Sequence, residues 1–509
     1  MLVALALAPI ALLLTLLLWA RWSAGAAGAA AAAIAALVAV AAFDYGTEGV
    51  ALALGGPFAE ALFQSATILW IIFPALCIHE YQTASGGTAL FGRALAGLST
   101  DPRIIALLIA WFFALFLEGA AGFGTPIALA APLLVSLGFS PPAALALALI
   151  GSAAAVPFGA IGTPMAPLIE ATGLDSLALS VAIVLLNASV GWILALLIVR
   201  IASRDRHASA SSGTVLAILS AALFFALAAL LAATTGPELP SLGGALIGSF
   251  IFVLIVRRRA RRAKGSIAKS AASTFPSTGE LVRAAMPYLV VIALILATRL
   301  IGPVAEWLRS VTLAWSLPGG FAGSAMPLHH PGTMLLLAFL IAALAHRSHR
   351  RLIAPAAANA LRRLPMVALA LVSVLMLARL LVHSGMVELL AGSAAGLFGG
   401  GWPLVAPLLG ALGSFVTGSG TASNILFGNF QASAAELAGV SPLIVAAAQA
   451  VGGAAGNLIA PHNIVAGAAT IGLVGREGEI LRRTLPPALL YAATAGVVAL
   501  ATSIFLGAL

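Results

Sequence analysis

Charge is what this sequence most lacks: only 8% of its 509 residues are charged, while 62% are hydrophobic. Soluble domains carry charge on about a quarter of their residues, so the composition excludes a soluble fold of this length. The chain has one cysteine, Cys77, which excludes a disulfide within the chain and a cysteine metal cluster. It also has no Walker-type phosphate loop, which argues against a transporter driven directly by ATP.

Long apolar runs take the place of the missing charge. They recur from end to end, and many are long enough to cross a hydrocarbon core of about 30 Å. Membrane-spanning β-barrels alternate apolar and polar residues, whereas these runs are continuous. The sequence therefore predicts an all-α polytopic membrane protein of about 12–14 transmembrane helices, in two pseudo-repeats that each contain broken or re-entrant helices.

The formal net charge of +9 has a membrane explanation and predicts no nucleic-acid partner. Lys and Arg lie in short loops between apolar runs, as in the cytoplasmic loops of membrane proteins. The expected partner is the lipid bilayer, and the expected location is the cell inner (plasma) membrane, with many passes. The basic segment 257–283 is the predicted cytoplasmic linker between an N-terminal transmembrane half, 1–256, and a C-terminal half, 284–509.

Small residues, prolines and polar groups interrupt the apolar sequence in two clusters, 118–167 and 413–463. Broken helices leave backbone groups that lipid cannot satisfy, so such segments must line a cavity or pack on protein. Matching broken segments in two halves indicate the substrate site of a transporter. The alternative is that the glycines only permit close helix packing, which suits isolated glycines better than dense clusters with polar companions.

The first cluster contains LEGAAGFGTP at 117–126 and VPFGAIGTP at 156–164, so a Gly-Thr-Pro tripeptide closes both motifs. Such turns expose amide groups at helix N-termini, where the helix dipole and unpaired donors favour an anion such as a carboxylate. The threonine hydroxyls add further donors. The predicted substrate-binding residues in this cluster are Gly122, Gly124, Thr125, Gly162 and Thr163.

The second cluster contains TGSGTASN at 417–424 and GGAAGN at 452–457, with PHN at 461–463 beyond. Its hydroxyls and amides are suitable partners for the carboxylate and hydroxyl of a small hydroxy acid, and a neutral imidazole can donate or accept. The predicted substrate-binding residues here are Ser419, Thr421, Ser423, Asn424, Asn457 and His462.

Three charged residues are candidates for coupling or anchoring. Glu118 ends the apolar run FFALFLEG, and intramembrane acids face cavities and relay protons, so it is the predicted coupling residue; the alternative is an interfacial acid at a helix end. Arg299 and Arg379 lie near the ends of apolar runs and are candidate carboxylate anchors. The alternative for both arginines is contact with lipid headgroups.

No motif predicts an enzyme. The pairs His79-Glu80 and His329-His330 lack the spacing of a metal-binding helix, so no metal is expected. The sequence shows no nucleophile–base pair and no cofactor fingerprint, so neither catalysis nor a cofactor is expected.

The sequence resembles the L-lactate permease family in these motifs and their order. The resemblance extends over two longer stretches, GSFVTGSGTASNILFGNFQ and GGAAGNLIAPHNIVAGAATIGLVGREGE. The resemblance implies proton-coupled uptake of lactate, glycolate and related 2-hydroxymonocarboxylates, on a fold of inverted repeats with re-entrant hairpins. The chain departs from the family pattern at Gly420, where relatives usually carry Asp, and at Asn457, where they carry Lys. Ser152-Ala153-Ala154 likewise replaces Asn-Thr-Ala. Losing an acid and a base together leaves the local charge unchanged.

The preferred interpretation is a secondary active transporter that imports L-lactate or a related small 2-hydroxymonocarboxylate such as glycolate by proton symport. Two alternatives remain open. One is a carrier for another small organic anion with sodium coupling, because hydroxyls and carbonyls of broken helices also suit sodium. The other is a passive anion channel, which predicts uptake that does not respond to the proton gradient.

Overall fold

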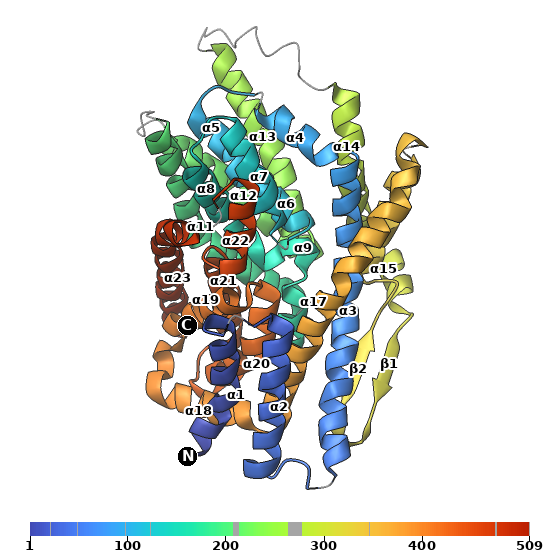
Figure 1. Ribbon diagram of the computed structural model, residues 1–509, viewed down its shortest axis with the longest axis vertical. Coiled ribbons are helices and arrows are strands. Elements are labelled where there is room, and N and C mark those ends of the chain that lie inside the picture. The colour runs from blue at the N-terminus through green and yellow to red at the C-terminus, as the bar shows by residue number, and fades with distance from the viewer. Residues whose placement is uncertain are drawn as a thin grey trace.

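A computed structural model describes residues 1–20, 22–47, 49–96, 98–122, 124–206, 213–262, 277–345, 347–473 and 476–507. Figure 1 shows an elongated bundle of helices. Among the described residues, 11 helices are long and apolar enough to cross a membrane, or 12 if the bent pair Pro141–Ala153 and Val156–Gly162 counts as one span. The predicted polytopic α-helical class is confirmed. Residues 263–276 of the predicted linker lie outside the described residues.

The chain up to Arg262, which includes the first residues of the predicted linker, is helical almost throughout. Its helices are α1 (Leu2–Leu18), α2 (Ala24–Ala42), α3 (Val50–Ala84), α4 (Gly87–Ala96), α5 (Pro102–Ala106), a π-helical stretch (Leu107–Phe113), α6 (Ala114–Ala120), α7 (Thr125–Ser136), α8 (Pro141–Ala153), a 3-10 turn (Val156–Phe158), α9 (Gly159–Gly162), α10 (Met165–Thr172), α11 (Ser176–Asp205), α12 (Gly213–Thr235) and α13 (Pro240–Arg262).

The chain from Thr278 onward adds one small hairpin to its helices. Its elements are α14 (Thr278–Leu300), α15 (Gly302–Arg309), β1 (Leu313–Ser316), a 3-10 turn (Pro318–Gly320), β2 (Ala322–Ala325), α16 (Pro331–Ala345), a 3-10 stretch (Arg347–Leu352), α17 (Ile353–His383), α18 (Met386–Phe398), a 3-10 turn (Gly399–Gly401), α19 (Trp402–Thr417), α20 (Gly420–Leu437), α21 (Pro442–Asn457), α22 (Pro461–Thr470) and α23 (Glu477–Gly507).

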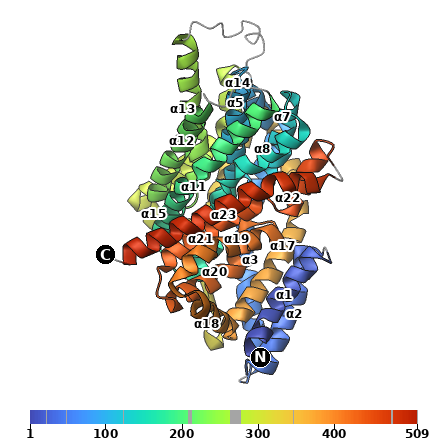
Figure 2. The same cartoon turned by 90° about the vertical axis from the view of Figure 1, so that its left-hand side faces the viewer.

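The long helices α3 and α17 run antiparallel along one side of the molecule (Figure 1). Near one end, Arg363 of α17 pairs with Glu80 of α3 at 2.7 Å, and near the other end Arg379 lies 3.7 Å from Glu60. Figure 2 shows α1 and α2 at the lower end of the molecule, where α2 packs against α17. A Cβ placed on Gly28 of α2 would lie 3.0 Å from Cβ of Ser373, so small residues permit this close approach.

The backbone carbonyl groups at the helical break after α8 accept hydrogen bonds from side chains of other helices. Asn187 of α11 donates to the carbonyl of Ala154 at 2.8 Å, and Ser241 of α13 donates to the carbonyl of Ala155 at 2.8 Å. Lipid offers no hydrogen bonds to such carbonyls, so a broken span needs polar partners inside the protein. These two bonds therefore hold the first cluster's break inside the bundle.

The connection between α14 and α16 forms structure that the sequence analysis did not anticipate. Strands β1 and β2 pair antiparallel, with Leu313 opposite Ala325. The backbone N–H of Ala322 donates to Oε1 of Glu60 at 3.2 Å, and the rings of Trp315 and Phe63 pack edge to face with centroids 5.8 Å apart. The hairpin thus lies along α3, the helix that carries Glu60.

Candidate substrate site

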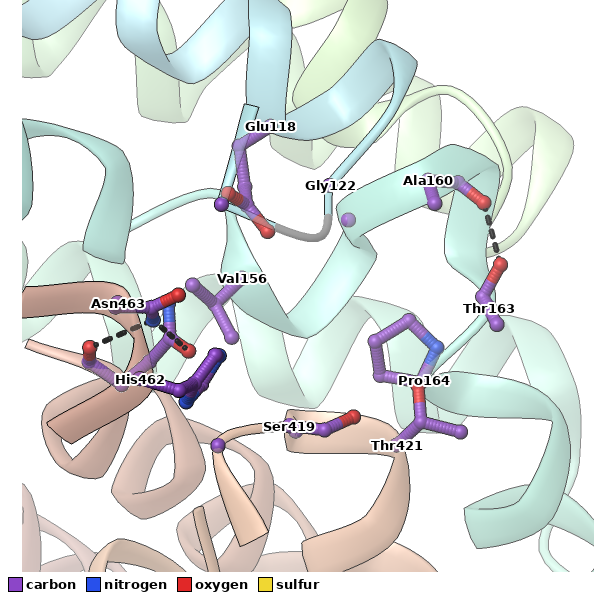
Figure 3. Close-up of a pocket in the computed structure, with 15 residues that line it drawn as sticks. Glu118, Gly122, Val156, Ala160, Thr163, Pro164, Ser419, Thr421, His462 and Asn463 are labelled. Carbon is purple, nitrogen blue, oxygen red and sulfur yellow. Dashed lines mark hydrogen bonds between the residues drawn. The ribbon is translucent and has the colours of Figure 1, made fainter. Parts of the chain in front are cut away.

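The two sequence clusters meet around a cavity of ≈ 160 Å³. Figure 3 shows Glu118, Ala160 and Thr163 from the first cluster on one side, with Ser419, Thr421 and His462 from the second cluster facing them. Each cluster contains two pairs of helices that are interrupted by a turn or a break. In the first cluster the pairs are α6 with α7 and α8 with α10. In the second cluster they are α19 with α20 and α21 with α22. Four of these helices, α7, α10, α20 and α22, begin beside the cavity, so their N-terminal dipoles favour an anion there.

Glu118 is the carboxylate of this site. It lies at the end of α6 and is 6% exposed. A Cβ placed on Gly159 would lie 2.9 Å from Oε1 of Glu118, and one on Gly122 would lie 3.6 Å from the same oxygen. The glycines therefore leave the space that the carboxylate occupies. None of the described residues that line the cavity is Lys or Arg.

Thr163 is positioned by an unusual backbone. Ala160, Ile161 and Gly162 all have positive φ angles, of 42°, 55° and 78°. The left-handed conformation costs a residue with a side chain about 1–2 kcal/mol, and such strain concentrates at functional sites. The turn brings Thr163 to the cavity wall, where its hydroxyl donates to the carbonyl of Ala160 at 2.6 Å. Gly162 itself lies outside the wall, against the carbonyl of Pro237.

The turn between α19 and α20 brings Ser419 to the opposite wall. Gly418 has φ 73°, and the His462 imidazole occupies the place where its Cβ would be, so this turn requires glycine. Ser419 is the N-cap of α20, with its hydroxyl accepting from the N–H of Ala422 at 3.3 Å. Thr421 follows in the first turn and also lines the cavity.

Asn457 and Asn463 complete the second cluster's wall. Nδ2 of Asn463 donates to Oδ1 of Asn457 at 2.9 Å. Oδ1 of Asn463 is buried and has no hydrogen-bond partner among the described residues, and a Cβ on Gly124 would lie 3.3 Å from it. An unpaired buried acceptor is costly, so this oxygen is suited to accept from a bound ligand.

Four predicted substrate-binding residues lie outside the cavity wall: Gly162, Thr125, Ser423 and Asn424. Ser423 donates to the carbonyl of Gly410 at 2.9 Å. Asn424 donates through Nδ2 to the carbonyl of Pro164 at 2.8 Å, which joins the second cluster to the first. These two side chains fix the backbone of the site, whereas Gly122, Gly124, Thr163, Ser419, Thr421, Asn457 and His462 line it.

The two candidate arginine anchors also lie elsewhere. Arg299 donates to Oε1 of Glu238 at 2.6 Å and to the carbonyl of His329 at 3.1 Å. Arg379 pairs with Glu170 of α10 and Glu60 of α3. Both guanidinium groups are thus held by protein carboxylates away from this cavity.

The cavity wall also contains residues that the sequence analysis did not select. All of them belong to the same quoted motifs, and Asn463, whose Oδ1 is unpaired, follows His462 directly, so proximity in sequence was the available signal. The added residues are Val156, Gly159, Ala160, Pro164, Gly418, Gly420 and Asn463.

Comparison with known proteins places the chain in one family. Residues 2–506 match the family model described as L-lactate permease. The L-lactate permease of Streptococcus iniae is 33% identical over 385 residues, which cover 75% of this chain and 80% of that protein. The glycolate permease GlcA of Escherichia coli strain K12 is 29% identical over 486 residues, covering 85% and 84%.

A solved structure shares the fold at low sequence identity. The YdaH transporter of Alcanivorax borkumensis superposes with a TM-score of 0.51 at 17% identity, covering 88% of this chain and 86% of that one. This likeness concerns the fold alone. Since the family model spans nearly the whole chain and the fold is a multi-pass helical bundle, the protein belongs to the L-lactate permease family, a family of membrane transporters rather than enzymes.

Proposed function

We propose that this protein is a secondary active transporter of the cell inner membrane that imports L-lactate or a related small 2-hydroxymonocarboxylate, such as glycolate, by proton symport. Relatives named L-lactate permease and glycolate permease support this substrate class. The observation that carries the proposal is the cavity itself, where helix N-termini and hydroxyl groups face the carboxylate of Glu118.

The cavity size favours a small acid. The cavity of ≈ 160 Å³ is smaller than the roughly 300–1,000 Å³ of pockets that hold drug-sized ligands. Lactate and glycolate suit a cavity of this size, whereas a di- or tricarboxylate of twice their bulk requires a larger space.

The polar groups of the wall match the two ends of a 2-hydroxy acid. The N-terminus of α20, with the hydroxyls of Ser419 and Thr421, is suited to the carboxylate. The unpaired Oδ1 of Asn463 is suited to accept from the substrate hydroxyl. In this assignment Thr163, Asn457 and His462 contact the substrate, whereas Gly122 and Gly124 leave room for it.

Glu118 is the proposed coupling residue. An anionic substrate beside an ionised Glu118 would place two negative charges in one small buried cavity. A proton on Glu118 removes this repulsion, so the proton and the anion bind together more favourably than either binds alone. The free energy of the proton gradient then drives accumulation of the anion.

The test is uptake of radiolabelled L-lactate into proteoliposomes under an inward proton gradient, an inward sodium gradient or no gradient. We expect accumulation above equilibrium only with the proton gradient. Glu118→Gln should abolish this accumulation yet retain lactate exchange, whereas Glu388→Gln, at an exposed position on α18, should behave as wild type.

Each alternative predicts its own outcome. Accumulation driven by sodium alone would replace proton coupling with sodium coupling. Uptake that only equilibrates and shows no counterflow would indicate a passive channel. Full proton-driven accumulation in Glu118→Gln would refute the role of Glu118. Absence of uptake by folded protein would redirect the search to a panel of other small organic anions.

A further inference from the structure

A second group of titratable side chains lies outside the cavity, where α3, α10 and α17 meet. Arg379 of α17 pairs with Glu170 of α10, and its Nε lies 3.7 Å from Oε2 of Glu60 on α3. One turn further along α17, Nε2 of His383 lies 2.7 Å from the same Glu60 oxygen. We call these four residues, Glu60, Glu170, Arg379 and His383, the Arg379 cluster. Gln64 of α3 bonds to both Glu170 and Arg379.

The Arg379 cluster has one acid too many. Its two carboxylates face a single guanidinium, which is always charged, so with a neutral imidazole the formal charge is −1. The Glu60 side chain is only 8% exposed and that of Arg379 19%. The Glu170 side chain is 47% exposed and that of His383 24%, so an uncompensated charge is costly chiefly at buried Glu60. One proton on His383 brings the formal charge to zero.

No further cation among the described neighbours balances the excess acid. From β2, the Phe321 ring meets the imidazole edge to face at 4.8 Å. Tyr45, before α3, interacts electrostatically with Glu60, and its buried hydroxyl has no hydrogen-bond partner among the described residues. On α18, which follows His383, Glu388 is exposed. His383, with Nε2 2.7 Å from the Glu60 carboxylate, is therefore the described base that can add the balancing positive charge.

The other end of the same two helices provides a contrast. There, Glu80 of α3 and Arg363 of α17 pair one to one at 2.7 Å, and the Arg363 side chain is 57% exposed. That pair joins α3 to α17 with one acid and one arginine and no excess acid, and neighbouring His79 interacts electrostatically with both members. Joining these helices therefore does not by itself require the composition of the Arg379 cluster.

The Arg379 cluster is connected to the substrate cavity through α10. This helix begins at Met165, directly after Thr163 and Pro164, which line the cavity. Arg379 contacts both carboxylates at once, and a proton on His383 would let Glu60 pair with the imidazolium and leave Arg379 to Glu170 of α10. With His383 neutral, Arg379 is shared between two carboxylates, so its hold on α10 weakens.

The cluster also lies toward a defined side of the membrane. The Glu80–Arg363 end of the helix pair adjoins the basic stretch Arg347–Leu352, which by the positive-inside rule faces the cytoplasm. Because α3 and α17 are antiparallel, the Arg379 cluster lies in the opposite, outer part of the bundle. With this orientation, the external pH is the one to which His383 would respond.

We propose that His383 is a proton-binding site separate from Glu118, and that its occupancy sets the affinity of the outward-facing cavity for substrate through Arg379, Glu170 and α10. This inference rests on the proposed function. By linkage, protonation of His383 and substrate binding favour one another by the same factor. The proton on Glu118 drives accumulation, whereas the proton on His383 acts as a positioning charge.

The test measures KM and maximal rate of L-lactate exchange against external pH for wild type, His383→Gln and Glu80→Gln. Binding of one linked proton changes KM by at most about tenfold per pH unit. We expect KM of wild type to rise with pH more steeply than that of His383→Gln. His383→Gln should keep its maximal rate and its proton-driven accumulation, and Glu80→Gln should match wild type.

Glu170→Gln is the second variant, for use if His383→Gln does not fold. It removes the excess acid, so its KM should also depend less steeply on pH than that of wild type. A wild-type slope of KM against pH in either folded variant would overturn the inference. A slope lost together with proton-driven accumulation in His383→Gln would also overturn it, since the proton on His383 would then be transported. Failure of wild type to exchange lactate at all would instead refute the proposed function.

Discussion

Gly159→Ala tests whether the position of the Glu118 carboxylate determines transport. The backbone of Gly159 has φ −64° and ψ 154°, a conformation open to alanine, so the substitution introduces no backbone strain. The new methyl group would lie 2.9 Å from Oε1 of Glu118, where ordinary contacts begin at 3.4 Å. The carboxylate must therefore move by about 0.5 Å, into a cavity of only ≈ 160 Å³.

The substitution should impair transport more than it lowers the free energy of unfolding. Because the displaced atom is the end of a flexible side chain, the free energy of unfolding should decrease by about 1 kcal/mol at most, the lower end for overpacking. A substrate site tolerates such a displacement poorly. We expect at least a tenfold rise in KM for L-lactate exchange, equivalent to about 1.4 kcal/mol.

The assay compares exchange kinetics and thermal stability of Gly159→Ala with those of Gly396→Ala. Gly396 lies in α18, and a Cβ added there would have nothing within 4 Å, so alanine should leave transport unchanged and slightly stabilise the helix. Wild-type KM in folded Gly159→Ala would refute the view that Glu118 acts from its present position.

Two stability predictions follow from ion pairs away from the cavity. Arg299→Met should lower the free energy of unfolding by about 3–5 kcal/mol, because it leaves buried Glu238 unpaired; Arg299→Met with Glu238→Leu should recover most of this loss in detergent unfolding experiments. Outside the membrane span, burial raises the pKa of Asp101, but bonds from Arg103 lower it by more, so the pKa lies below its ordinary value. The ionised Asp101 carboxylate therefore stabilises the fold at pH values above its ordinary pKa, and this stabilisation is lost as pH falls through the folded-state pKa. Asp101→Asn should cost about 1 kcal/mol near neutral pH and flatten the acid side of the stability profile; an unchanged acid limb would contradict this.

The local motifs predicted most of the cavity wall. Glu118, Thr163, Ser419, Thr421 and His462 stand beside glycines and prolines inside apolar sequence, and the structure brings them together. This was predictable because a polar, broken segment within a membrane span needs a protein-lined cavity or protein partners.

Other candidates could not be sorted by sequence alone. Ser423 and Asn424 share the motif of Ser419, yet they bond to the carbonyls of Gly410 and Pro164. A hydroxyl or amide on a broken helix suits a ligand and a backbone carbonyl equally well. Which of them it meets depends on the helix that packs against it.

The arginines show the same limit over longer distances. Arg379 and its partner Glu170 are 209 residues apart, and His383 and Glu60 are 323 residues apart. The pattern of apolar runs indicated each arginine as a candidate anchor for an anion. Each does hold a carboxylate, but one supplied by the protein itself.

The sequence by itself determined that this chain is a helical membrane protein with two broken polar clusters, because hydrophobic length and the need to satisfy backbone groups act locally along the chain. Only the tertiary structure decided that the clusters face one another across one cavity, and that Glu170, Arg379 and His383 meet around the buried carboxylate of Glu60. The physical reason is that hydrophobic patterning fixes which segments enter the membrane, whereas the packing of helices distant in sequence fixes which polar groups meet.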